Sequence, residues 1–167
     1  MPRNADKGTN MAQNGIGGLF RDFGQSLGEF FGGGKTDPQR DIGLQVAFAL
    51  LGYLAKLDSL ITSHEAEFIN GAMDALTLSM RERELASEAL QRGRNREIDL
   101  HEEFSRFREI YKPHSPESER LYDALIRLAA ADERLRPKER QFLELATAEL
   151  GYPSEELDRR LAAALPK

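Results

Sequence analysis

Two segments of the chain, residues 48–76 and 122–150, resemble each other at a constant offset of 74 positions. The matched pairs are Phe48 with Tyr122, Leu51 with Leu125, Leu54 with Leu128, Ala55 with Ala129, Asp58 with Asp132, Ile61 with Leu135, Glu65 with Glu139, Phe68 with Phe142, Ile69 with Leu143, Ala72 with Ala146 and Leu76 with Leu150. Each segment is typical of a helix, a tight turn that opens on Asp, and a second helix with Glu in its first turn. The repeat therefore predicts two helical hairpins related by a pseudo-twofold axis, each covering the apolar face of the other.

Residue types at helix ends support an all-α bundle. Capping boxes are predicted for Thr62 with Glu65, Ser79 with Glu82 and Asp99 with Glu102, and Pro116 and Pro137 suit first helical positions. Gly93 and Gly151 are predicted to end helices. No segment alternates with a period of two, and the apolar face predicted for the helix at 137–150 is Phe142, Leu143, Leu145, Ala146 and Leu150. We predict about seven helices, near 40–57, 63–76, 79–92, 99–111, 116–131, 137–150 and 154–164.

Glycine marks a domain boundary near residue 40, because nine of the 14 glycines lie in the first 34 residues. We expect residues 1–40 to be a largely disordered arm and residues 41–167 to be one helical domain. The arm contains apolar residues at helical spacing, here called the phenylalanine stripe: Leu19, Phe20, Phe23, Leu27, Phe30 and Phe31. Gly24 and Gly28 make such a helix marginal alone. Either the arm stays disordered, or Phe20, Phe23, Phe30 and Phe31 bind a partner groove or, with no basic cluster to help, weakly contact a membrane surface.

Composition excludes several classes of function. The 23 Lys and Arg against 28 Asp and Glu, a net charge of -5, argue against a nucleic-acid partner. The absence of cysteine excludes disulfides, thiolate zinc sites and thiol nucleophiles. The three histidines, His64, His101 and His114, fall at separate helix starts, and no serine sits in a glycine elbow. Arginines cluster at 92–96 and 106–108, but glutamates nearby can neutralise them. We expect no catalytic residues.

The doubled turn carries a family resemblance. Lys56 to Glu65 and Ala130 to Glu139 resemble the paired Asp-Gly-x-hydrophobic-x-x-x-Glu turns of TerB-like, tellurite-resistance domains. The stretches 99–109, 135–139 and 149–151 further resemble the amino-terminal domain of the DjlA membrane-anchored, DnaJ-like co-chaperones. The resemblance covers about residues 42–164. Ser59 and Glu133 replace the glycine of each turn.

This resemblance implies a TerB-like helical fold and an interaction role in bacterial stress or envelope response, with metal binding in some members. The co-chaperones add a transmembrane segment in front and a J-domain behind, and we expect neither in these residues. A J-domain acts through a His-Pro-Asp loop, whereas His114 is followed by Ser115 and Pro116. Stimulation of an Hsp70 ATPase by that route is therefore not expected.

The acidic turns have two interpretations. Asp58, Glu65, Asp132 and Glu139 can supply the oxygen ligands that Ca²⁺ or Mg²⁺ prefers, and two of these carboxylates follow helix ends where the helix dipole disfavours them. The same carboxylates can instead accept hydrogen bonds from their own turns, which needs no cofactor.

We expect an interaction or scaffolding domain of the bacterial cytoplasm that works with a protein partner, either free or at the periphery of the inner membrane. The alternative is a divalent-metal sensor that uses the paired acidic turns.

Overall fold

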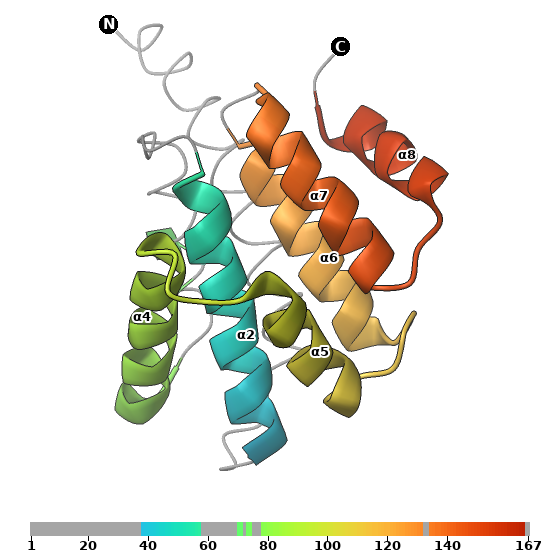
Figure 1. The fold of residues 1–167 in the computed structure, drawn as a ribbon. Coiled ribbons are helices and arrows are strands. Elements are labelled where there is room, and N and C mark those ends of the chain that lie inside the picture. Colours follow the sequence, from blue (N-terminus) through green and yellow to red (C-terminus); the bar gives the residue numbers. More distant parts are fainter. Residues whose placement is uncertain (1–37, 58–69, 72, 75–77, 132–133, 166–167) are drawn as a thin grey trace, which may run out of the picture.

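The computed structural model describes residues 38–57, 70–71, 73–74, 78–131 and 134–165, and this part of the chain is helical without a strand (Figure 1). Its helices are α2 (Pro38–Ala55), α4 (Met80–Arg94), α5 (Leu100–Ile110), α6 (Pro116–Ala129), α7 (Pro137–Glu149) and α8 (Ser154–Ala164). The predicted all-α class is confirmed. Six of the seven predicted helices correspond to these elements, and the seventh, at 63–76, lies largely outside the described residues.

Short oxygen side chains begin α4, α5 and α6 as predicted. At α4, Ser79 Oγ accepts the backbone N–H of Glu82 at 3.2 Å, and the Glu82 carboxylate accepts the backbone N–H of Ser79 at 3.2 Å. Asp99 and Ser115 each accept the backbone N–H three residues further on, which starts α5 and α6. These bonds satisfy amide groups that have no partner inside their own helix. The box predicted at Thr62 lies outside the described residues.

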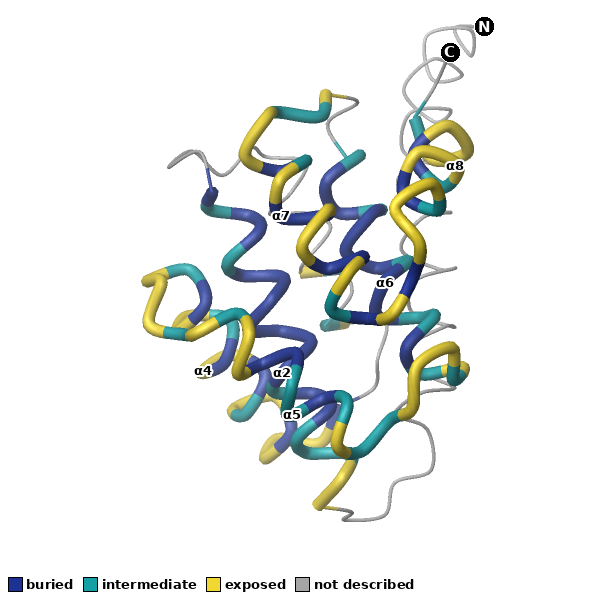
Figure 2. Tube along the Cα trace, turned by 45° about the vertical axis from the view of Figure 1, so that its right-hand side comes forward, coloured by how far each residue is buried: buried dark blue, intermediate teal, exposed yellow. Residues whose placement is uncertain are grey.

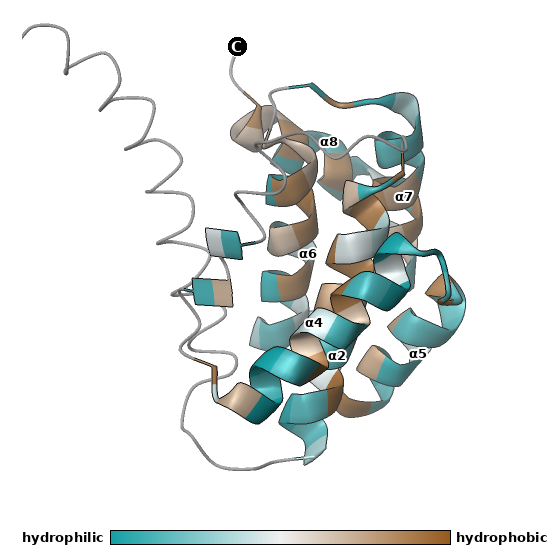
Figure 3. Cartoon of the chain, turned by 90° about the vertical axis from the view of Figure 1, so that its left-hand side faces the viewer, coloured by the Kyte–Doolittle hydropathy of each residue, from teal (hydrophilic) through white to brown (hydrophobic). Residues whose placement is uncertain are grey.

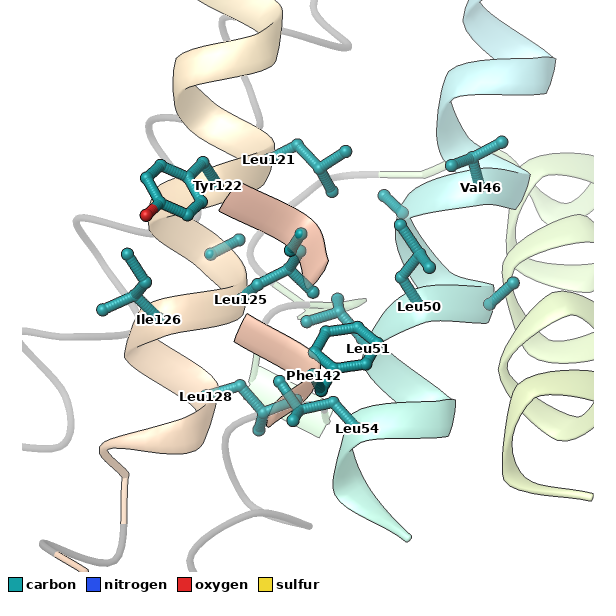
Figure 4. Packing of buried hydrophobic residues seen from close by; sticks show 14 of the residues in the cluster. Val46, Leu50, Leu51, Leu54, Leu121, Tyr122, Leu125, Ile126, Leu128 and Phe142 are labelled. Atoms are coloured by element: carbon teal, nitrogen blue, oxygen red, sulfur yellow. The ribbon is translucent and has the colours of Figure 1, made fainter. Parts of the chain in front are cut away.

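Helix α2 forms the centre of the core because its sequence is almost continuously apolar. The tube of Figure 2 is dark blue along most of α2, and Leu44, Phe48 and Leu50 are fully buried. Helices α4, α5 and α6 pack around α2. Unlike α2, helix α4 consists mostly of hydrophilic residues (Figure 3). Figure 4 shows Leu50, Leu51 and Leu54 of α2 facing α6, with Phe142 of α7 between the two helices.

Helices α2 and α6, the first helices of the two repeat units, run in the same direction. Val46 lies level with Leu121, and Leu54 lies level with Leu128 (Figure 4). The repeat partners on these helices are all buried, with at most 3% of any side chain exposed: Phe48, Leu51, Leu54 and Ala55 on α2, and Tyr122, Leu125, Leu128 and Ala129 on α6. The repeat thus places equivalent residues in one shared core.

Helices α2 and α4 also run in parallel and approach closely through glycine. Arg40 near the start of α2 pairs with Glu82 near the start of α4 at 2.6 Å. Further along, a Cβ atom on Gly52 would lie 2.2 Å from the Leu90 carbonyl oxygen, and one on Gly93 would lie 2.0 Å from the Ala49 carbonyl oxygen. Backbone contact of this kind leaves no room for any side chain at either position.

One of the two predicted glycine stops is wrong. Gly151 follows α7 with φ 84, and the N–H groups of Gly151 and Tyr152 donate to Ala148 and Thr147, as in a Schellman ending. Gly93, in contrast, is a buried residue inside α4. The left-handed position after α4 belongs to Arg96, with φ 58, because Gly93 is required for the helix contact.

Candidate functional site

The carboxyl-terminal ends of α2 and α6 lie at the same end of the bundle, since the two helices are parallel (Figures 1 and 4). Asp58 follows α2 and Asp132 follows α6 in the sequence, but both residues, together with Glu65, lie outside the described residues. The same holds for Phe20, Phe23, Phe30 and Phe31 of the arm. Of the residues predicted as sites, the structure therefore places Glu139.

Glu139 lies in the first turn of α7 and is buried, with 2% of its surface exposed. Its Oε1 accepts the backbone N–H of Arg136 at 3.1 Å, which is the contact expected of a glutamate in the first turn. Pro137 precedes it at the first helical position. Among the described residues, no three His, Asp or Glu side chains gather closely enough to hold a metal ion. The observed role of Glu139 is thus to stabilise the start of α7.

A groove lies beside this helix start, between the end of α2, the beginning of α5 and one side of α7. We call it the Leu145 groove; its volume is about 340 Å³, and it is lined by Tyr53, Leu57, Arg96, Leu100, Lys138, Gln141, Phe142 and Leu145. The rings of Tyr53 and Phe142 stack with centroids 5.8 Å apart. Leu145 is 37% exposed, and among the described residues the only other large apolar side chain so exposed is Met80. The prediction that Leu145 belongs to the buried face of α7 is therefore wrong.

Among the described residues that line the Leu145 groove, the two charged ones are basic. Arg96 is held at one edge because its Nη2 donates to the Leu57 carbonyl oxygen at 2.9 Å. Lys138 is the second residue of α7, where the positive end of the helix dipole disfavours a cation. An apolar floor with two cations at its edge suits an apolar segment that carries acidic residues.

A second cavity of about 390 Å³ lies between α6 and α8. Its charged residues already have partners within the fold: Arg127 Nε pairs with Asp123 at 2.8 Å, and Arg160 pairs with Glu119 at 2.7 Å. Arg127 Nη1 has no acceptor, but protein atoms cover it, so it offers no contact to a molecule in the cavity. This cavity is therefore a weaker candidate for a binding site than the Leu145 groove.

Arg160 instead attaches α8 to the rest of the helical bundle. Its guanidinium lies 4.8 Å from the ring centre of Tyr122 and 5.1 Å from that of Tyr152, and the two rings stack at 4.6 Å. Tyr152 donates from its hydroxyl to Glu119 at 2.6 Å. Burial raises the pKa of the Tyr152 phenol, and the bond to Glu119 raises it further. Burial also works to raise the pKa of Glu119, but the bonds from Tyr152 and Arg160 outweigh it and lower that pKa.

Arg108, in the arginine cluster at 106–108, is likewise paired within the fold and does not form a free basic surface. Arg108 donates to the carbonyl oxygen of Glu149 at 2.7 Å and to its carboxylate at 2.6 Å. His101 contacts the other Glu149 oxygen at 3.0 Å. Burial acts to raise the pKa of Glu149, but these two partners outweigh it and lower the pKa. The cluster joins α5 to the end of α7.

The described histidines take part in packing and pairing. His101 pairs with Glu149, and His114 packs edge-on against Tyr152 with ring centres 4.8 Å apart. His64 lies outside the described residues. These contacts hold α5 and the loop before α6 in place, and this is the role that the structure shows for the two histidines.

Comparison with known proteins finds one matching family model and a set of relatives that share one name. The family model described as tellurite resistance protein TerB matches residues 45–162. The co-chaperone protein DjlA of Aliivibrio fischeri is 28% identical over 157 residues, which cover 93% of this chain and 51% of that protein. The co-chaperone protein DjlA of Vibrio vulnificus is 30% identical over 132 residues, covering 78% of this chain and 46% of that protein.

The chain thus spans about half the length of the curated relatives it matches. No solved structure matches it. Among the described helices, none combines the length and the apolar character that crossing a membrane requires.

Proposed function

The chain belongs to the tellurite resistance protein TerB family, and from this membership we propose that it is a non-catalytic protein-interaction module of the TerB/DjlA type. Its curated relatives are named as co-chaperones, and co-chaperones act by contact with other proteins. We place the module in the bacterial cytoplasm, at the periphery of the inner membrane, in a stress or envelope response.

The Leu145 groove is the observation that carries this proposal. Interfaces are anchored by a few apolar or aromatic side chains that fill pockets, surrounded by polar groups at the rim. The groove offers a stacked aromatic floor in Tyr53 and Phe142 and an exposed Leu145, with Arg96 and Lys138 at its edge. A partner segment with apolar anchors and flanking carboxylates would match it. We include Phe20, Phe23, Phe30 and Phe31 of the arm in the contact region.

Photo-crosslinking in cells tests the proposal. A photoreactive amino acid replaces Gln141 in the groove, and a matched control carries it at Glu88, an exposed residue of α4. We expect a discrete crosslinked protein from position 141 and none from position 88. Adding Leu145→Glu, or replacing the four arm phenylalanines by Ala, should reduce that product. The same products from both positions would contradict the proposal.

We propose divalent-metal binding as the second candidate function. The parallel course of α2 and α6 supports it, because these helices, which Asp58 and Asp132 follow in the sequence, end at the same end of the bundle (Figures 1 and 4). Glu139 lies in the first turn of α7, seven residues after Asp132 in the sequence, and with Asp58 and Glu65 these carboxylates would give the oxygen ligands that Ca²⁺ or Mg²⁺ prefers.

Calorimetric titration of the full chain with Ca²⁺, Mg²⁺, Mn²⁺ and Zn²⁺ tests this second candidate. A cation that binds only the folded chain should also raise the melting temperature. Asp58→Asn with Asp132→Asn should abolish both effects, while Asp74→Asn, an exposed acidic residue, should leave them unchanged. Neither heat nor a melting shift at millimolar ion would refute metal binding.

A further inference from the structure

We propose that the partner that occupies the Leu145 groove is an amphipathic helix of another protein, with an apolar anchor and a carboxylate seven residues apart. This identification rests on the proposed function, because it concerns the same groove. Three features of the groove support it: the position of its two cations, their distance from the exposed leucine, and its size.

The two cations lie at one end of the groove. Helices α2 and α7 run in opposite directions (Figure 1), and the rings of Tyr53 and Phe142 stack with centroids 5.8 Å apart. Leu57 is four residues after Tyr53, and Lys138 is four residues before Phe142, so both lie on the same side of this ring pair. Arg96 belongs to that end as well, because its Nη2 donates to the Leu57 carbonyl oxygen at 2.9 Å.

The exposed leucine lies at the other end. Leu145 follows Phe142 by three residues, whereas Lys138 precedes it by four. At 100° per residue, Lys138 and Leu145 leave α7 within about 20° of each other, and at 1.5 Å per residue they are about 10 Å apart along the helix axis. The groove is therefore polarised, with positive charge at one end and an apolar side chain that is 37% exposed at the other.

A helix is the structure that fits this spacing. Two partner residues that are seven positions apart on a helix repeat the separation of about 10 Å on one face. In an extended segment the same distance corresponds to about three residues, whose side chains point to opposite faces. Helices that pack side by side at a small angle, about 20°, present such rows of side chains to each other. The partner helix is therefore expected to lie alongside α7.

The size and charge of the groove indicate what enters it. A volume of about 340 Å³ is at the small end of the range for ligand pockets, about 300–1,000 Å³, so the groove accepts side chains and not a helix backbone. The apolar anchor would cover Leu145, and the carboxylate would lie between Arg96 and Lys138. None of the described residues that line the groove is acidic, so none of them competes for these cations. A carboxylate there would also relieve the unfavourable position of Lys138 in the first turn of α7.

Peptide selection with the full chain as bait tests the proposal. The probes are short, helix-forming peptides displayed on phage, in which Ala, Gln, Glu, Lys, Leu and Phe vary along one face. The baits are wild type, Lys138→Glu, and Lys112→Glu, a control with the same change of charge at an exposed residue outside the described lining of the groove. We expect wild type and control to select Glu seven residues from Leu or Phe. Lys138→Glu, which places an acid where a helix start favours it, should select Lys in place of that Glu.

Fluorescence anisotropy of one selected peptide, labelled with fluorescein, measures the effect of charge. The peptide should bind Lys138→Glu at least about tenfold more weakly than wild type, and the same peptide with Lys in place of Glu should bind Lys138→Glu better than wild type. Leu145→Glu should weaken both. No enriched peptide, or the same peptides from wild type and Lys138→Glu, would overturn the proposal. Binding of phosphatidylglycerol vesicles that depends on Leu145 and Lys138, without any enriched peptide, would also overturn it and would indicate a membrane surface as the occupant.

The crosslink at position 141 separates this proposal from the proposed function. A crosslinked protein whose contact segment lacks the apolar and acidic pair on a helix would refute the present proposal and leave the proposed function standing. Peptides with the expected spacing, but no crosslinked protein from position 141, would refute the proposed function alone, because the groove would then bind such a helix without finding one in the cell.

Discussion

At the scale of single residues, the close approach of α2 and α4 depends on two glycines. A Cβ on Gly93 would lie 2.0 Å from the Ala49 oxygen and 2.9 Å from the Tyr53 nitrogen. These are backbone atoms in a buried helix, so neither can move aside without shifting α2. Gly93 would therefore behave differently from an ordinary glycine in a helix, where Ala is favoured.

We expect Gly93→Ala to lower the free energy of unfolding by about 1–3 kcal/mol or more, the usual cost of overpacking a core, despite the better helix propensity of Ala. Urea denaturation measures the change. Ser87→Ala, at an exposed position of the same helix, is the control and should have almost no effect. A Gly93→Ala chain as stable as the wild type would mean that α2 and α4 can separate freely.

Leu145 and Gly93 show, residue by residue, how sequence patterns succeed and fail. At 100° per residue, Phe142, Leu143, Ala146 and Leu150 share one side of α7, and Leu145 lies about 115° from its middle. The exposure of Leu145 could therefore have been predicted from its position on the helix, although its hydrophobicity suggested burial. For Gly93, the sequence holds no sign of the long-range contact with Ala49, because a glycine can end a helix or admit a neighbouring backbone.

At the scale of elements, helix starts were better predicted than contacts between helices. Caps at Ser79, Asp99 and Ser115 are local interactions within four residues, so their residue types suffice to predict them. The attachment of α8 depends instead on Arg160 meeting Tyr122 and Tyr152. No sequence spacing specifies that contact, and the Leu145 groove likewise combines residues from three separate stretches of the chain, 53–57, 96–100 and 138–145.

The Arg160 contacts predict that α8 can be loosened separately from the core. Arg160→Lys keeps the charge but loses the planar group that lies over both rings and pairs with Glu119 and Glu156. We expect the amides of α8 to exchange hydrogen faster by at least about tenfold, the effect of about 1.4 kcal/mol, because local opening becomes easier.

Amides of α2, buried in the core and remote from α8 in sequence, should keep their protection in the same exchange experiment. Arg159→Lys is the matched control, since Arg159 pairs with Glu156 but lies over neither ring. Uniform loss of protection along the chain would show that α8 and the core open together.

At the scale of the whole molecule, ionisable groups link stability to pH in two opposite ways. The pKa of Glu82, Glu119 and Glu149 is lowered: burial acts to raise each one, but hydrogen bonds and basic partners outweigh it. Their contribution is present above the unfolded glutamate pKa and is lost as the pH falls through the folded values. Acid should therefore destabilise the chain.

Glu103 acts in the opposite direction. It is 4% exposed, its Oε2 has no hydrogen-bond partner, and its ion pairs with Arg92 and Arg106 are long, at 3.6 and 3.5 Å. Burial raises its pKa more than Arg106 and Arg92 lower it, with Glu102 adding to the rise. The folded chain therefore holds a proton on Glu103 more readily than the unfolded chain does. Stability from this group falls as the pH rises from the unfolded pKa through the folded one.

Glu103→Gln isolates the pH-dependent contribution of Glu103 to stability, because the amide mimics the protonated carboxyl. We expect the stability of the variant, relative to wild type, to be greater at pH 7 than at pH 4, since ionised Glu103 is disfavoured only at the higher pH. Urea denaturation of both chains at the two pH values measures the difference. Glu102→Gln, an exposed neighbour in the same helix, is the control and should show a much smaller dependence. If Arg92 and Arg106 stabilise the ionised carboxylate more than burial opposes it, the sign will reverse, and Glu103 must then be counted with the carboxylates that acid titration removes.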